Sequence, residues 1–320
     1  MRKTNYIGLT IFFLVINFFI FPSKIFSQDY FSGKITYQVS YQNPENHENA
    51  SHLETEKEVD SIVYYIADGN YKSETFFKGK LTETYVYNQE DAWVHYLFPD
   101  KNYYLSIDAS SEKMNQNFKF EWLNEEKNIL NQPTQKAKVT QGYQTEEIYY
   151  ADSIRVNPEE FKDHNYAYWY KTLKKVDGRL PLKNLYFDPN YIEVKEAINY
   201  EEIEFTKGFF TPKTEYRKVV YREILDQEAQ LNPLTPEAEK CYQQKASSVE
   251  NKLIVGKNDH YVIQVVVDEN GNPVLAKSIT TNEAFYTVAE EIILECGFKF
   301  EPAIYKNKKV TSELYIPIEL

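Results

Sequence analysis

The N-terminal part of the chain consists of short runs in which apolar and polar residues alternate with a period of two. Such alternation predicts β-strands with one buried face. Turn sequences at Asp68-Gly69-Asn70 and Lys78-Gly79-Lys80 separate several runs, which predicts an antiparallel meander. The predicted strands span residues 31–39, 61–67, 71–77, 81–88, 92–98, 102–107, 138–140, 144–150, 182–187, 191–198 and 217–225.

Three other stretches lack this alternation. Residues 42–60 are polar and acidic and predict a loop, and residues 110–138 are polar and irregular and predict no strand. Residues 225–236 contain Pro233 and Pro236 and are typical of a linker. Thr235 before Pro236 is a favourable helix start, which predicts a helix over 237–249.

The last part of the chain changes pattern twice. Residues 261–267 alternate as a strand, Asn270-Gly271 is typical of a tight hairpin turn, and residues 274–280 form a returning strand. An amphipathic helix follows, and a final strand comes after it. The predicted order is therefore strand, strand, helix, strand. The apolar stripe of the helix comprises Phe285, Val288, Ala289, Ile292 and Cys296.

The N-terminus has the pattern of an export signal. Arg2 and Lys3 precede an uncharged, mostly apolar run at residues 6–21, and Ser27 is a small residue that suits cleavage before Gln28. The run is shorter than the roughly 20 residues that span a bilayer core. We expect a periplasmic or outer-membrane-associated protein after export. The alternative is an inner-membrane anchor through residues 6–21.

Composition and charge narrow the classes of function. The 28 Tyr, 20 Phe and only 10 Gly favour sheets. The formal net charge of -12 argues against nucleic acid and anionic membrane surfaces as partners. Adjacent tyrosines, such as Tyr64-Tyr65, Tyr103-Tyr104 and Tyr149-Tyr150, should point to opposite faces of a strand. They favour either ordinary sheet packing or an aromatic groove for an apolar or sugar ligand.

No motif indicates catalysis. The five His form no HExxH pattern, and there is neither a G-x-S-x-G elbow nor a Gly-rich phosphate loop. The sequence therefore predicts a non-catalytic protein without a metal or another cofactor. Cys241 and Cys296 form no CxxC motif, and both a disulfide between them and two free buried thiols stay open.

Residues 31–226 resemble the GLPGLI-type proteins of Bacteroidetes envelopes. The resemblance rests on FSGKITYQV at 31–39, DGNYKSE at 68–74, TEEIYYAD at 145–152 and LPLKNLYF at 180–187. It implies an antiparallel sheet similar to the curved, half-open sheets of lipoprotein carriers. The resemblance thus implies a curved half-barrel, and it adds the carriage of an apolar, lipid-like ligand as an alternative function.

Residues 255–320 resemble the C-terminal domain of the TonB family. The resemblance is carried by Phe300-Glu301-Pro302-Ala303, by the turn at 305–310 and by Ile316-Pro317-Ile318. It implies a small ββαβ domain that docks on outer-membrane transporters by strand addition. The implied docking strand contains Val310, Ser312, Leu314, Ile316 and Ile318, and the implied turn and core residues are Asn270, Gly271, Phe285, Ala289, Ile292, Pro302 and Pro317.

The chain departs from an energy transducer of that family. Its apolar run contains no His, and a predicted β domain replaces a Pro-rich linker. We therefore predict an α+β protein with a signal peptide at 1–27, an antiparallel β domain at 28–226, a linker with a short helix at 227–250 and a TonB-like domain at 251–320. The expected function is non-catalytic docking to a TonB-dependent transporter or another envelope protein. A periplasmic carrier and a membrane-anchored energy transducer are the alternatives.

Overall fold

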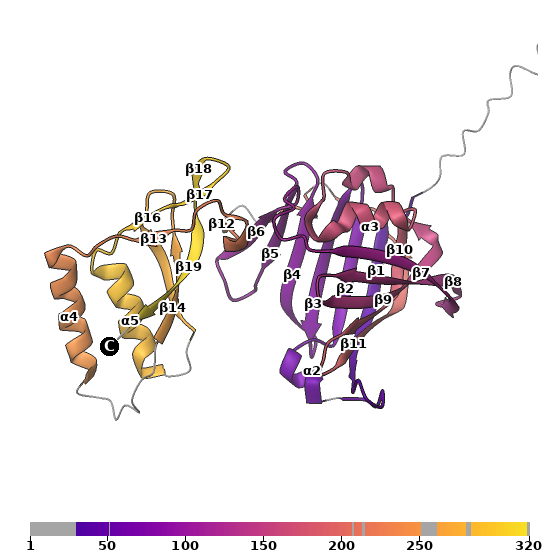
Figure 1. The fold of residues 1–320 in the computed structure, drawn as a ribbon, viewed down its shortest axis with the longest axis horizontal. Coiled ribbons are helices and arrows are strands. Elements are labelled where there is room, and N and C mark those ends of the chain that lie inside the picture. The colour runs from indigo at the N-terminus through magenta and orange to yellow at the C-terminus, as the bar shows by residue number, and fades with distance from the viewer. Residues whose placement is uncertain are drawn as a thin grey trace, which may run out of the picture. The chain divides into compact units, whose positions relative to one another are not determined.

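A computed structural model describes residues 30–50, 52–206, 208–212, 215–250, 261–279 and 283–318 (Figure 1). Contacts within the chain separate Met1–Tyr30 from Phe31–Leu320, and the description below concerns the second unit. The predicted signal peptide lies outside the described residues. None of the helices within the described ranges is long and apolar enough to span a membrane.

Strands β1 to β6 form an antiparallel meander in which each strand pairs with the next. Gly69 and Gly79 adopt positive φ in the turns on either side of β3, where the sequence predicts tight turns. Helix α2 (His52–Lys57) lies in the stretch that the sequence predicts as a loop. The strands are β1 Gly33–Gln42, β2 Ser61–Ala67, β3 Asn70–Phe77, β4 Lys80–Asn88, β5 Trp93–Leu97 and β6 Tyr103–Asp108.

Five further antiparallel strands extend the sheet through the pairing of β1 with β11. The prediction of no strand at 110–138 is wrong, because β7 and part of β8 lie there. Their apolar residues Phe118, Phe120 and Trp122 pack on one side, while charged residues alternate with several of them. The strands are β7 Phe118–Ile129, β8 Gln132–Gln141, β9 Gln144–Arg155, β10 Arg179–Phe187 and β11 Ile192–Glu202.

The C-terminal strands continue the same sheet. Strand β12 (Arg217–Val220) pairs in parallel with β6, and β19 (Ser312–Ile318) meets β12 where Ser312 lies opposite Val220. Strands β14 (Tyr261–Val267) and β15 (Pro273–Ser278) follow in order, which completes one open sheet of 15 strands from β15 to β7. The predicted α+β fold with a separate small ββαβ domain is therefore wrong. The chain is mostly β, and its C-terminal strands form no separate sheet because β12 pairs with β6 on one side and with β19 on the other.

The helices and short strands complete the fold. Helix α4 starts as the sequence predicts, because the Thr235 hydroxyl accepts the Ala238 N–H at 3.2 Å. Helices α4 and α5 lie side by side (Figure 1). The remaining elements are η1 Pro158–Phe161, η2 Tyr166–Tyr168, α3 Trp169–Lys175, η3 Arg222–Ile224, β13 Gln230–Leu231, α4 Pro236–Glu250, α5 Glu283–Glu295, β16 Phe300–Glu301, β17 Ala303–Tyr305 and β18 Lys308–Val310.

The largest core lies between one face of the sheet and the segment that contains η1, η2 and α3. We call this face the inner face. Tyr71, Tyr87 and Phe161 are almost completely buried there, and Trp169 of α3 packs on Tyr71 with 5.1 Å between ring centroids. Burial of large aromatic side chains is a major stabilising term, so this contact holds the segment to the sheet.

The opposite, outer face of the sheet is crossed by residues 203–206 and 208–212, which we call the crossing segment. Phe205 and Phe209 pack on Tyr65, with ring centroids 6.2 and 5.1 Å from the Tyr65 ring. Tyr64, next to Tyr65, packs in the inner core instead. This tyrosine pair therefore splits between the two faces, as strand geometry predicts.

Candidate functional site

Strand β19 is paired very unequally on its two sides. On one side it forms an antiparallel ladder with β14 along its whole length, from Ser312–Val267 to Ile318–Tyr261. On the other side it meets β12 only at Ser312. After Val220 the chain passes from β12 into the short helix η3, which forms no strand pairing with β19. Among the described residues, no strand continues this second side beyond Ser312, and we call the stretch 313–317 the open edge.

The direction of the backbone groups on the open edge follows from one hydrogen bond. The Ile279 N–H donates to the Val262 carbonyl at 3.1 Å, so the backbone groups of Val262 face β15. Pro317 lies opposite Val262 across β14 and β19, and its backbone groups therefore point away from β14. By the same alternation, those of Tyr315 also face the open edge. Pro317 has no N–H, so Tyr315 supplies the donor nearest the centre of this edge.

The docking residues predicted from the sequence are distributed over the interior of this region. Leu314 and Ile316 pack against the core that contains Ile263 and Ile292, and Ser312 is completely buried. Val310 is partly buried between the two largest cores, and the side chain of Ile318 lies outside the described residues. The side chains of Ser312, Leu314 and Ile316 therefore fix β19 in place, and a partner would reach the backbone of the strand.

Two polar side chains beside the open edge, those of Glu313 and Tyr315, lie on the other face of β19, and sequence reasoning missed them. Glu313 is only 3% exposed, and burial raises the pKa of its carboxyl group. The Gln264 side-chain amide donates to Glu313 Oε2 at 2.5 Å and lies 3.4 Å from the Tyr315 hydroxyl. This polar cluster lies on the face of the sheet opposite Leu314, and alternation in 312–318 was the signal that could have identified it.

The predicted turn residues lie between β14 and β15, in a longer turn than the two-residue hairpin expected. The Asp268 N–H donates to the Asn272 carbonyl at 2.9 Å, and Asn270 is exposed. Gly271 has φ +80°, and a Cβ placed there would lie 2.0 Å from the Phe300 carbonyl oxygen. Gly271 is therefore required both by its backbone conformation and by this close approach.

The predicted core residues lie on α5 and next to the last strands. Ala289 and Ile292 are buried in the core beneath β14, whereas the Phe285 side chain lies outside the described residues. Pro302 separates β16 from β17, where its missing N–H suits a break between strands. Cys296 follows α5 and is joined to Cys241 of α4 by a disulfide with 5.4 Å between Cα atoms. The disulfide connects the two helices to each other.

The aromatic side chains of the inner face bear on the two alternatives of ordinary sheet packing and an aromatic groove. Tyr71 stacks between Tyr64 and Tyr85, with ring centroids 5.6 and 5.5 Å away. His164 packs on Tyr87 with 4.4 Å between centroids, and both side chains are almost completely buried. The rings therefore pack mainly on one another, which favours ordinary sheet packing over an aromatic groove.

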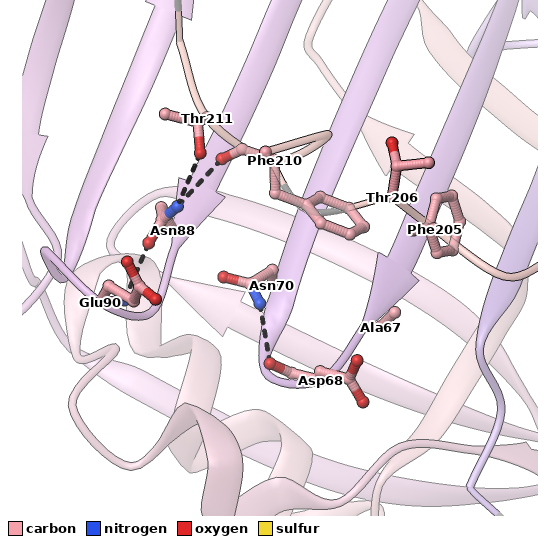
Figure 2. A pocket seen from close by; sticks show the side chains of 10 residues that line it. Ala67, Asp68, Asn70, Asn88, Glu90, Phe205, Thr206, Phe210 and Thr211 are labelled. Carbon is pink, nitrogen blue, oxygen red and sulfur yellow. Dashed lines mark hydrogen bonds between the residues drawn. The ribbon is translucent and has the colours of Figure 1, made fainter.

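A pocket of about 250 Å³ lies between the crossing segment and the hairpin ends of β2 to β5 (Figure 2). Figure 2 shows the Asn88 amide next to the Phe210 carbonyl and the Thr211 hydroxyl, with N···O distances of 3.3 and 3.5 Å. The Asn88 side-chain oxygen in turn accepts the Glu90 N–H at 2.8 Å. Both the nitrogen and the oxygen of the Asn88 side chain therefore bond to other groups of the protein. We interpret these bonds as a structural contact that attaches the crossing segment to the sheet.

One arrangement on the outer face has the residue types of a hydrolase triad. His95 Nε2 lies 3.2 Å from Asp91 Oδ2, and His95 Nδ1 lies 2.9 Å from Ser106 Oγ. A hydrolase needs a reachable nucleophile and a buried carboxylate. Here Ser106 is completely buried, and the Asp91 side chain is 46% exposed. The serine is thus buried and the carboxylate exposed, the opposite of what a hydrolase triad needs. The three groups instead connect β5, β6 and the turn before β5.

A larger cleft of about 580 Å³ lies at the ends of β5 and β6, next to the turn between β17 and β18. Asp108 at its wall accepts hydrogen bonds from the Tyr305 hydroxyl at 2.8 Å and the Lys306 ammonium group at 2.6 Å. These bonds hold the pKa of Asp108 below its usual value although burial opposes them. Within the described ranges, no group of three or more His, Cys, Asp or Glu side chains could hold a metal ion.

No protein-family model and no curated protein matches the sequence. Two solved structures of PNGF-II are 13% and 11% identical, with TM-scores of 0.38 for both. They align with 76% and 75% of this chain, which spans less than half of their own length, at 45% and 44%. MucB in complex with MucA(peri) is 11% identical over 65% of this chain and 61% of that chain, with a TM-score of 0.30. At these TM-scores the likeness carries no functional argument.

Proposed function

We propose that this chain is a non-catalytic docking protein of the cell envelope. It binds an extended segment of an outer-membrane protein, such as a TonB-dependent transporter, which adds a strand to the open edge of β19. The single observation that carries the proposal is the pairing of β19, which is complete on the β14 side and ends at Ser312 on the other. An exposed row of backbone donors and acceptors is the feature that strand addition uses.

The residues of the open edge suit the binding of an additional strand from a partner. Tyr315 is 38% exposed, and Pro317 is exposed as well, so an incoming backbone can reach them. The Arg222 guanidinium lies 5.6 Å from the Tyr315 ring centroid and adds a cation beside the edge. A Pro near the end of an edge limits how far pairing extends, which discourages uncontrolled association of edges.

The test compares one variant that loses the backbone N–H of residue 315 with another that loses only the side chain. In Tyr315→Pro the N–H on the open edge is lost, whereas the bonds of β19 to β14 use other residues. In Tyr315→Ala the ring is lost and the N–H stays. The purified proteins are sedimented with outer-membrane vesicles of the native bacterium, and with protein-free lipid vesicles as the control. We expect binding by the wild type and Tyr315→Ala, and a loss of about tenfold or more in Tyr315→Pro.

Circular dichroism and urea unfolding of both variants show whether they are folded before binding is compared. Equal binding by Tyr315→Pro and Tyr315→Ala would contradict strand addition at this edge. Equal binding of the wild type to protein-free lipid would contradict a protein partner in the outer membrane.

A further inference from the structure

The cleft at the ends of β5 and β6 contains a lysine whose charge is not matched by an acid. The ammonium group of Lys218 on β12 lies 3.5 Å from the centroid of the Trp93 ring. Among the described side chains, no carboxylate forms an ion pair with Lys218. Burial lowers the pKa of this ammonium group, and the nearby charges of Asp91 and Asp108 only partly oppose the effect. A partly buried cation without an ion pair is stabilised by any anion that reaches it.

The acidic groups of the same cleft are already engaged by other donors. Asp108 accepts from Tyr305, Lys306 and the Ser110 hydroxyl. Glu269 accepts the Thr311 hydroxyl at 2.9 Å, and Asp91 accepts the Trp93 N–H at 3.0 Å and lies 3.2 Å from His95 Nε2. None of the three carboxylates forms an ion pair with Lys218, although the charges of Asp91 and Asp108 act on it from further away. Positive charge therefore remains on this wall of the cleft although the chain as a whole carries a net charge of -12.

Two further lysines border the cleft from the hairpin of β17 and β18. Lys308 and Lys309 line the cleft, are exposed and form no ion pair with any described residue. Trp93 and Tyr305 supply flat apolar surface, with 5.9 Å between their ring centroids in an edge-to-face arrangement. The cleft thus combines a partly buried cation, two exposed cations and aromatic walls in a volume of about 580 Å³.

We propose that this cleft binds a small organic anion, a carboxylate or phosphate monoester attached to a flat apolar group. The anionic group pairs with Lys218, and the apolar group packs on Trp93 and Tyr305. Lys308 and Lys309 attract the anion and pair with it at the entrance. This site is separate from the open edge of β19, so it stands or falls independently of the proposed docking function.

Isothermal titration calorimetry with four probes tests the assignment. Phenyl phosphate and benzoate contain both parts of the proposed ligand, inorganic phosphate lacks the ring, and benzyl alcohol lacks the charge. Lys218→Met removes the central cation. Lys171→Met is the matched control, because Lys171 also lies over an aromatic ring, 4.7 Å from the Phe118 centroid, and does not line the cleft. A double variant, Lys308→Gln with Lys309→Gln, alters only exposed side chains and serves if Lys218→Met does not fold.

We expect phenyl phosphate or benzoate to bind more tightly than inorganic phosphate, and benzyl alcohol not to bind. Lys218→Met should lower the affinity by about tenfold or more, and the double variant should lower it and reduce its dependence on salt. Lys171→Met should retain the wild-type affinity. Failure of both organic anions to bind, unchanged affinity in Lys218→Met and the double variant, or an equal loss in Lys171→Met would overturn the proposal. Equal affinity for inorganic phosphate would overturn the role of the aromatic walls.

Discussion

Acid should destabilise this protein in part through His164, a buried histidine in its aromatic core. His164 is 1% exposed, and its Nε2 atom lies 2.7 Å from the Tyr71 hydroxyl. Its Nδ1 atom is buried without a hydrogen-bond partner. Burial lowers the pKa of His164 to about 3, from an ordinary value of 6.5. The fold therefore holds the neutral imidazole, whereas the unfolded chain takes up a proton below its ordinary pKa.

The sign and size of the effect follow from proton linkage. Between the two pKa values the unfolded state binds one more proton than the folded state, so stability is lost as the pH falls. One pKa unit corresponds to about 1.4 kcal/mol, which gives a loss of about 2 kcal/mol between pH 7 and about pH 5. The full effect, reached near the folded pKa, is about 5 kcal/mol.

The assay compares urea unfolding of the wild type and His164→Gln at these two pH values. Glutamine does not titrate, and its side-chain amide N–H can donate to the Tyr71 oxygen, whose own proton goes to Tyr85. The variant should therefore lose about 2 kcal/mol less than the wild type on acidification. Other shifted groups, such as His95 and Glu313, titrate in both proteins and cancel in the comparison. An identical pH dependence of the two proteins would refute the buried, neutral state of His164.

Two further changes test the C-terminal part of the sheet. Replacing Cys241 and Cys296 by serine should lower the free energy of unfolding by about 4 kcal/mol, because the disulfide closes a loop with a sequence separation of 55 residues. Equal urea midpoints of the oxidised wild type and the serine variant would contradict this expectation. Gly271→Ala should cost about 2 kcal/mol or more, since φ is positive and the Cβ meets the Phe300 carbonyl. Asn270→Ala, at the exposed neighbouring position, is the control and should change stability little.

Local turns made the first meander predictable from sequence. Gly69 and Gly79 occupy left-handed positions between strands whose side chains alternate, so turn chemistry and periodicity indicate the same structure. Strands β7 and β8 escaped prediction because many of their residues are charged or amide-bearing. Apolar alternation fails as a signal where so much of a strand is exposed.

The continuity of the sheet could not be predicted from local patterns. The pairing of Val220 with Ser312, and of β12 with β6, joins segments that are far apart in the chain. The two strands, the helix and the last strand predicted near the C-terminus are present, with the short strands β16, β17 and β18 between α5 and β19. Nothing in their own residues shows which strand lies beside β19. The candidate docking edge depends on that neighbour. The lack of an ion pair at Lys218 likewise depends on where the acidic side chains of the cleft lie in the folded chain.

Hydrogen–deuterium exchange of individual amides in β19 tests the central claim most directly. Tyr315 directs its N–H to the open edge, whereas Leu314 and Ile316 direct theirs to β14. The account predicts rapid exchange at Tyr315 next to slow exchange at Leu314 and Ile316 in the free protein. It also predicts slower exchange at Tyr315 when outer-membrane vesicles are added. Protection of Tyr315 equal to that of Leu314 in the free protein would contradict the open edge and the docking function built on it.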